Sequence, residues 1–223
     1  MSAEVPGTGR LVAALRRQGA LRRYDRGAVI FSERDIADRL FVLERGWVLI
    51  RSCGPDGRDV VLGLRGPGEV LGELSVLDGK PRSATAVAAV DAELTVTPAA
   101  VLRTVLDADH EATRELLIVI ADRLREADRR RLEYTTLDTL ARVAARLLEL
   151  AERFGEPLPA GVRVELPLVQ EDLARWCGAS REATVKSLRT LRGLGLITTG
   201  RREVTIHDLR GMRQAASGQA VGG

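Results

Sequence analysis

The sequence predicts an α+β fold in which a β-rich N-terminal domain is joined by a long helix to a helical C-terminal domain. Short apolar runs recur at roughly ten-residue spacing between Ala28 and Thr97, which is typical of strands in a sandwich or barrel. From Asp109 to Glu133 the chain has no glycine or proline, as a long helix requires. Two short helical patterns and a small hairpin pattern follow in the last third.

In the N-terminal domain the expected strands are separated by turn residues such as Glu44–Gly46 and Gly66–Gly68. Before them, Leu11–Leu15 predicts a short helix packed on the outside of the domain. The strands are expected at residues 28–32, 40–43, 47–50, 60–62, 85–88 and 93–97.

The long helix carries an apolar stripe at helical spacing. Such a stripe favours a helix that pairs with a copy of itself, and a helix that lies on its own domain is the alternative. The stripe consists of Leu117, Ile120, Leu124, Ala127 and Tyr134.

The C-terminal third predicts a compact helical domain. Thr139–Phe154 is an amphipathic helix that ends before Gly155. After Arg213 the chain has little to bury, so a disordered tail is expected. Between them, two helices separated by a turn and then a hairpin are expected at residues 170–177, 181–191, 197–199 and 204–206.

Composition excludes several classes of protein. The 223 residues are 45% hydrophobic and 29% charged, which is ordinary for a globular chain. With no apolar run near the ~18 residues of a membrane span and no signal-peptide pattern, we expect no membrane partner and a cytoplasmic protein. Two cysteines and two histidines favour neither a disulfide framework nor a metal site. The chain also lacks a Ser/His/Asp set and a Walker loop, so we expect no enzyme.

Residues 71–86 concentrate the residue types of a phosphate cradle. Gly72 lets the backbone approach an anion, a short helix starting near Glu73 directs amides at it, and Arg82 adds a planar guanidinium. Glu73 would repel a phosphate but suits a hydroxyl donor such as a ribose. A turn with a surface arginine is the alternative interpretation.

Residues 170–188 predict a helix-turn-helix, with the start of its second helix facing outward. On that helix Arg181 can pair with guanine, Glu182 can accept from the cytosine amino group, and Lys186 can reach a guanine or a phosphate. Gln170 and Ser180, at helix starts, would contact the DNA backbone. An ordinary helix pair with a charged outer face is the alternative.

The hairpin after these helices would act as a wing, with Arg201 and Arg202 near phosphate. The segment Gln170–Arg213 holds nine basic and five acidic residues, whereas residues 1–137 are balanced. A basic segment of this kind fits an anion-binding face, although charge alone decides nothing.

Both motifs resemble those of the cyclic-AMP receptor protein/FNR (Crp/Fnr) family of bacterial transcription regulators. The resemblance implies a jelly-roll-like cyclic-nucleotide-binding β-roll, a dimerisation helix and a winged helix-turn-helix domain. On this basis the boundaries are expected at residues 1–108, 109–137 and 138–213, with the disordered tail at 214–223.

Carried over from the family, the segment 71–86 becomes a phosphate-binding cassette. Arg82 and Ser83 would contact the cyclic phosphate, and Glu73 the ribose 2′-hydroxyl. Gly72, Leu74 and Ser75 would shape the cradle.

In cyclic-AMP-responsive members the long helix supplies an arginine and, a turn later, a Thr-Ser pair that meets the adenine. Arg123 matches that arginine, but Ala127 and Asp128 stand where the hydroxyl pair would be. Asp128 could accept from adenine or from guanine. Cyclic AMP is therefore the favoured ligand, with cyclic GMP or no nucleotide left open.

The resemblance implies a homodimer that reads a palindromic operator in double-stranded DNA, with RNA polymerase as a candidate partner. Thr184 and Ser187 depart from the aliphatic residues usual there, so a slightly less stable domain is expected. Two alternatives remain: a ligand-independent regulator with a vestigial cassette, and a nucleotide-binding module that acts on a partner protein.

Overall fold

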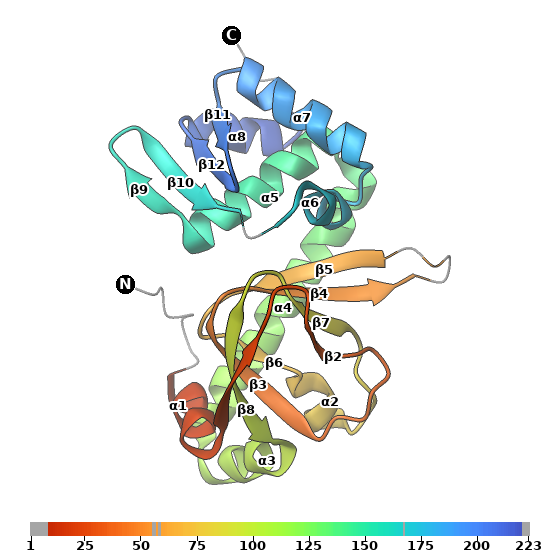
Figure 1. Cartoon of the computed structure of the whole chain (residues 1–223), viewed down its shortest axis with the longest axis vertical. Coiled ribbons are helices and arrows are strands. Elements are labelled where there is room, and N and C mark those ends of the chain that lie inside the picture. Colours follow the sequence, from red (N-terminus) through yellow and green to blue (C-terminus); the bar gives the residue numbers. More distant parts are fainter. Residues whose placement is uncertain (1–8, 55–56, 58, 167, 220–223) are drawn as a thin grey trace. The chain divides into compact units, whose positions relative to one another are not determined.

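The computed structural model describes residues 9–54, 57, 59–166 and 168–219 (Figure 1). The chain forms two compact units, Met1–Glu126 and Ala127–Gly223. Helix α4, His110–Thr136, runs across the boundary between them. The helix expected at residues 109–137 corresponds to α4, which the division into units cuts after Glu126.

The first unit contains two four-stranded antiparallel sheets, which confirms the predicted β-rich domain. The strand order is β1-β8-β3-β6 in one sheet and β2-β7-β4-β5 in the other. The first sheet is made of β1 (Ala20–Tyr24), β8 (Ala92–Pro98), β3 (Arg39–Arg45) and β6 (Val70–Leu71). The second is made of β2 (Val29–Phe31), β7 (Thr85–Ala88), β4 (Val48–Cys53) and β5 (Asp59–Arg65). The strands β1 and β6 were not expected from the sequence.

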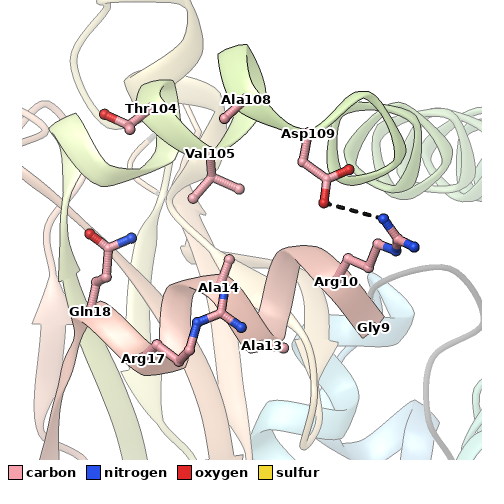
Figure 2. Close-up of a pocket in the computed structure, with 10 residues that line it drawn as sticks. All are labelled: Gly9, Arg10, Ala13, Ala14, Arg17, Gln18, Thr104, Val105, Ala108 and Asp109. Atoms are coloured by element: carbon pink, nitrogen blue, oxygen red, sulfur yellow. Dashed lines mark ion pairs between the residues drawn. The ribbon is translucent and has the colours of Figure 1, made fainter.

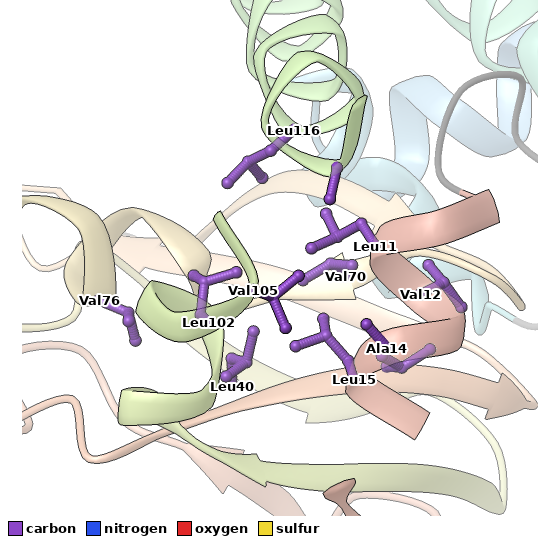
Figure 3. Packing of buried hydrophobic residues seen from close by; sticks show 12 residues of the cluster. Leu11, Val12, Ala14, Leu15, Leu40, Val70, Val76, Leu102, Val105 and Leu116 are labelled. Atoms are coloured by element: carbon purple, nitrogen blue, oxygen red, sulfur yellow. The ribbon is translucent and has the colours of Figure 1, made fainter. Parts of the chain in front are cut away.

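Strand β3 separates two hydrophobic clusters, because successive side chains of a strand point to opposite faces. Phe41 and Leu43 pack with residues of both sheets in the interior of the roll. Leu40 and Val42 face the other way, toward the helices α1 (Gly9–Gln18) and α3 (Ala99–Ala108). Figure 3 shows this outer cluster, in which Leu11 and Leu15 of α1 meet Leu102 and Val105 of α3.

The first part of helix α4 buries one face against the first unit. Ala112, Leu116 and Ile120, at successive spacings of four residues, pack into the outer cluster. Leu117 and Leu124 are 62% and 63% exposed. Ile120 of the predicted stripe therefore packs on the first unit, as the alternative interpretation expects, whereas Leu117 and Leu124 stay exposed.

The second unit is built on α5, Thr139–Phe154, whose predicted bounds the structure reproduces. It also contains α6 (Gln170–Cys177), α7 (Arg181–Gly193) and α8 (Leu209–Ala216). Its four-stranded sheet has the order β11-β12-β10-β9. The strands are β9 (Glu156–Leu158), β10 (Gly161–Glu165), β11 (Ile197–Gly200) and β12 (Glu203–Ile206).

Helix α8 corrects the expected start of the disordered tail. It continues to Ala216, because Met212 and Ala215 are buried and α8 packs on α5. The Asp208 side chain begins the helix by accepting from the amides of Arg210 and Gly211. Residues 220–223, the end of that expected tail, lie outside the described residues. Among the described residues every helix is too short or too polar to cross a membrane.

Candidate functional site

The cassette of the first unit is organised by Gly72, which directly precedes helix α2, Glu73–Asp78. Gly72 has φ +79°, in the left-handed region that glycine adopts without strain. A Cβ placed there would lie 2.4 Å from Nη1 of Arg82. Both the backbone conformation and the close arginine therefore require a glycine at this position.

Arg82 is buried beside this glycine, with 4% of its surface exposed. Its Nη1 donates to the Gly72 carbonyl at 2.7 Å, and its Nη2 donates to the Arg39 carbonyl. The guanidinium carbon lies 4.4 Å from the centroid of the Phe31 ring, a cation–π contact. Burial lowers the pKa of Arg82, opposed by the nearby carboxylates of Asp38, Glu73 and Asp35.

Glu73, 1% exposed, accepts a hydrogen bond from Nη1 of Arg123 of helix α4. Nη2 of Arg123 donates to the Val70 carbonyl, so the guanidinium joins α4 to the strand before the cassette. Burial lowers the pKa of Arg123, but the charges of Glu73, Glu69 and Glu126 outweigh it and leave that pKa raised.

Three buried polar atoms in the cassette and the adjoining part of α4 have no hydrogen-bond partner among the described residues: Oε2 of Glu73, Nε of Arg82 and Nε of Arg123. Buried polar atoms are rarely left unpaired in native proteins, since each costs desolvation free energy. An acceptor and two cationic donors in one place fit a ligand that offers both a hydroxyl and an anion.

The remaining cassette residues differ in exposure. Ser75 is buried and its Oγ donates to the Pro81 carbonyl at 3.2 Å, so it shapes the loop that leads to Arg82. Leu74 and Ser83 are exposed. Asp128 is an exposed residue of α4 and belongs to the second unit, whereas the cassette lies in the first.

Sequence reasoning missed the aromatic support of the cassette. Phe31 and Phe41 stack with ring centroids 5.6 Å apart, and both lie near the Arg82 guanidinium. Phe31 and Phe41 belong to β2 and β3, which precede the cassette in the sequence and reach it only through their pairing with β7 and β6, so no local sequence signal marked them. The Arg39 carbonyl gave no signal, because any residue supplies one.

A pocket of the first unit lies between α1 and α3, with a volume of about 480 Å³ (Figure 2). Small side chains such as Ala13, Ala14 and Ala108 line this pocket. At one end Nη1 of Arg10 lies 3.6 Å from Oδ2 of Asp109. Residues predicted to bind nucleotide do not contribute to its lining. In the described part of the chain, His, Cys, Asp and Glu side chains form no cluster suited to a metal ion.

In the second unit α6 and α7 form a helix-turn-helix, with Gly178 at φ +59° where α6 ends. Ser180 begins α7, because its Oγ accepts from the Ala183 amide at 3.1 Å. Thr184 and Ser187 are buried, and their hydroxyls donate to the carbonyls of Ser180 and Ala183. The two departures noted in the sequence therefore leave no unsatisfied hydroxyl.

The opposite side of α7 is exposed and polar. Arg181, Glu182 and Lys186 are all exposed, in the first turns of the helix. Gln170 is exposed at the first residue of α6. Arg201 is exposed at the tip of the β11–β12 hairpin, beside Arg202, which adopts φ +61°. This unit thus presents separate polar and basic side chains from two helix starts and a hairpin tip.

Comparison with known proteins gives matches to both units. Residues 21–109 match the family described as the cyclic nucleotide-binding domain, and residues 141–215 match the Crp-like helix-turn-helix domain. The CRP-like cAMP-activated global transcriptional regulator of Mycobacterium tuberculosis is 34% identical over 197 residues, which are 88% of each chain. The Cyclic AMP receptor protein of Thermus thermophilus is 31% identical over 202 residues, which are 89% of each chain.

Among solved structures, FixK2 from Bradyrhizobium japonicum superposes with a TM-score of 0.79, covering 92% of this chain and 99% of that chain. At 21% identity this likeness concerns the fold alone.

Proposed function

The chain belongs to the Crp/Fnr family of transcriptional regulators, and from that premise we propose that it is a sequence-specific DNA-binding protein controlled by a cyclic nucleotide, with cyclic AMP favoured. As a regulator that binds the chromosome it would act in the bacterial cytoplasm. RNA polymerase is the further partner expected if it activates transcription.

The observation that carries the nucleotide proposal is the set of buried, unpartnered atoms in the described cassette. The free Oε2 of Glu73 can accept from a ribose hydroxyl, and Arg82 can offer charge-assisted hydrogen bonds to a cyclic phosphate. Ser83, which is exposed beside Arg82, would add a hydroxyl to the same phosphate. Gly72, Leu74 and Ser75 would shape the cradle, and the cAMP-activated relative from M. tuberculosis favours cyclic AMP as the ligand.

The DNA-binding proposal rests on the exposed start of α7. Arg181 and Glu182 would contact base edges in the major groove, and Lys186 a guanine or a phosphate. Gln170, Ser180 and Arg201 would contact the DNA backbone.

Leu117 and Leu124, which are exposed on α4, support a homodimer. A two-fold dimer reads a palindromic operator.

The second candidate is a regulator that binds DNA without a nucleotide. Arg82 favours it, because both terminal nitrogens of its guanidinium already donate to carbonyls of the protein. Ala127 and Asp128 favour it as well, since they stand where the family resemblance implies a hydroxyl pair against the adenine. Asp128 remains a candidate acceptor for a base.

Titration calorimetry with cyclic AMP and with cyclic GMP separates the two candidates, with Arg82→Ala as the control. Micromolar binding of one nucleotide that is lost in the variant supports the proposed sensor and identifies the base. Absence of heat with both nucleotides overturns the sensor and leaves the ligand-independent regulator. Duplex DNA binding that weakens steeply with salt tests the second unit separately.

A further inference from the structure

The carbonyl groups at the end of α6 are held by two side chains from outside the helix-turn-helix. The last carbonyls of a helix have no partner within it. Here Oη of Tyr134 donates to the Trp176 carbonyl at 3.0 Å. Nε of Arg142 donates to the Cys177 carbonyl at 2.8 Å, and its Nη2 reaches the Gly178 carbonyl at 3.4 Å. Three consecutive carbonyls are thus bound by one tyrosine and one arginine.

The same two side chains also fix the turn by packing. A Cβ on Gly178 would lie 2.7 Å from Cε1 of Tyr134, so the ring lies directly against the turn glycine. The Arg142 guanidinium carbon lies 5.8 Å from the centroid of that ring. Nη1 of Arg142 donates to the Leu137 carbonyl at 2.6 Å, in the connection between α4 and α5. One guanidinium therefore joins that connection to the turn.

We propose that Tyr134 and Arg142 are positioning residues for DNA recognition, which set the direction of α7 by fixing the turn before it. This inference rests on the proposed DNA-binding function. Helix α7 begins at Arg181, three residues after Gly178, so the turn determines where Arg181 and Glu182 point. The rigid guanidinium fork is suited to this task, because it presents several donors in one plane.

Loss of these donors should affect base reading more than folding. The hydrogen bonds of Tyr134 and Arg142 to the turn are only partly buried or exposed, so water can replace a lost donor at small cost. Base contacts depend on geometry, whereas phosphate contacts act largely through charge and tolerate small displacements. A displaced α7 therefore loses discrimination before it loses general affinity for DNA.

The test uses two conservative variants of the full chain. Tyr134→Phe keeps the ring on Gly178 and removes only the hydroxyl donor, and Arg142→Lys keeps a cation and removes the fork. Tyr24→Phe and Arg103→Lys, which lie in the other unit, are the matched controls. The wild-type protein first selects its operator from random duplex DNA, with and without cyclic AMP. The dissociation constants of every variant are then measured for that operator and for a scrambled duplex at one salt concentration, together with the thermal midpoint.

We expect the ratio of operator to scrambled affinity to fall about tenfold in each test variant, about 1.4 kcal/mol. The scrambled affinity, the thermal midpoint and both controls should stay at wild-type values. A wild-type ratio in both variants overturns the inference alone, as does a parallel loss of both affinities with a lowered thermal midpoint. A wild-type protein that selects no sequence overturns the proposed function and this inference together.

Discussion

Arg123 of α4 forms an ion pair with Glu73 of the cassette, and this contact ties the long helix to the candidate ligand site. The Glu73 side chain is 1% exposed and the Arg123 side chain 19%. Removal of one member of such a pair leaves the other charge buried without compensation. The pair is therefore expected to matter for stability before any ligand is considered.

We predict that Arg123→Met destabilises the protein by about 3–5 kcal/mol, because it leaves the Glu73 carboxylate buried without its ion-pair partner. Glu73→Gln should cost less, because Glu69 and Glu126 still act on the charge of Arg123. The double variant should lose less than the sum of the two, with a coupling of about 2–3 kcal/mol. Denaturant unfolding followed by the fluorescence of Trp47, in a background in which Trp176 of the second unit is replaced by Phe, measures all three.

The matched control for this cycle is the pair Arg114–Glu111 on the same helix, with side chains 71% and 56% exposed. Its coupling should stay below about 0.5 kcal/mol, because solvent screens an exposed pair. Equal coupling energies for the two pairs would contradict the importance assigned to burial.

How far the sequence predicts this site depends on which atoms make it. Gly72, Glu73 and Arg82 were predicted from the chemical reason that each residue type has to be there, and the structure brings the three residues together. The bonds of Arg82 to backbone carbonyls were not predictable, because carbonyls are the same in every residue. The tertiary structure determines whether the Arg82 guanidinium points toward a ligand or toward carbonyls of the protein.

Leu117 and Leu124, two of the three leucines exposed on α4, give a prediction about assembly. Leu117→Lys combined with Leu124→Lys should convert a dimer to a monomer, because charges in an apolar helix seam oppose pairing. Sedimentation velocity measures the change. Ile36→Lys, at a position 89% exposed outside α4, is the control and should leave the assembly unaltered. A wild-type protein that sediments as a monomer would refute the proposed dimer.

For DNA reading we predict that Arg181→Ala and Arg201→Ala behave differently. Arg181→Ala should cost about 1–3 kcal/mol at one base position in each half-site and relax the choice of base there. Arg201→Ala should weaken binding to all sequences about equally and lower the salt dependence, as a lost phosphate contact does. Binding measured on single-base operator variants at two salt concentrations distinguishes them. Uniform weakening by Arg181→Ala would make that residue a phosphate contact instead.

Three elements that sequence analysis missed in whole or in part have weak hydrophobic patterning. Strand β1 has a mostly exposed sequence and pairs only at the edge of its sheet, with β8. Strand β6 has two residues, too few to show any period. The last turn of helix α8, residues 214–216, was expected to belong to a disordered tail, because its residues are small or polar. Its stability comes from packing on α5, which only the folded unit supplies.

Thr184 provides a prediction about the stability of the helix-turn-helix. It is fully buried, and its Oγ donates to the Ser180 carbonyl at 3.0 Å. That carbonyl also accepts from the Thr184 amide, so it keeps a donor when the hydroxyl is removed. Thr184→Val should therefore be neutral or stabilising within about 1 kcal/mol, and Thr184→Ala should destabilise by about 1–2 kcal/mol through the cavity it leaves. Thermal unfolding of the two variants measures these changes in stability. A strongly destabilised Thr184→Val would show that the hydroxyl is needed.

The two cysteines should differ sharply in reactivity. Cys53 is exposed and Cys177 is buried, and burial raises the pKa of the Cys177 thiol to about 12. The thiolate is the reactive form, so a disulfide reagent at pH 8 should modify one thiol rapidly in the native protein and the second only on unfolding. Cys53→Ser should abolish the rapid phase and Cys177→Ala should preserve it. Two rapid thiols in the wild-type protein would show that α6 opens readily.

The same thiol makes stability depend on alkaline pH. An unfolded cysteine has a pKa of about 8.5, so the folded pKa of Cys177 is raised above the unfolded one. Its contribution to stability is then fully present below about pH 8.5 and is lost as the pH rises toward 12, because the unfolded state releases the proton first. Burial also raises the pKa of Tyr134, which acts in the same direction. Comparison with Cys177→Ala isolates the thiol: its free energy of unfolding should fall less steeply between pH 8.5 and 11 than that of the wild type. Identical slopes for the two proteins would mean that Cys177 ionises as readily in the folded state as in the unfolded chain.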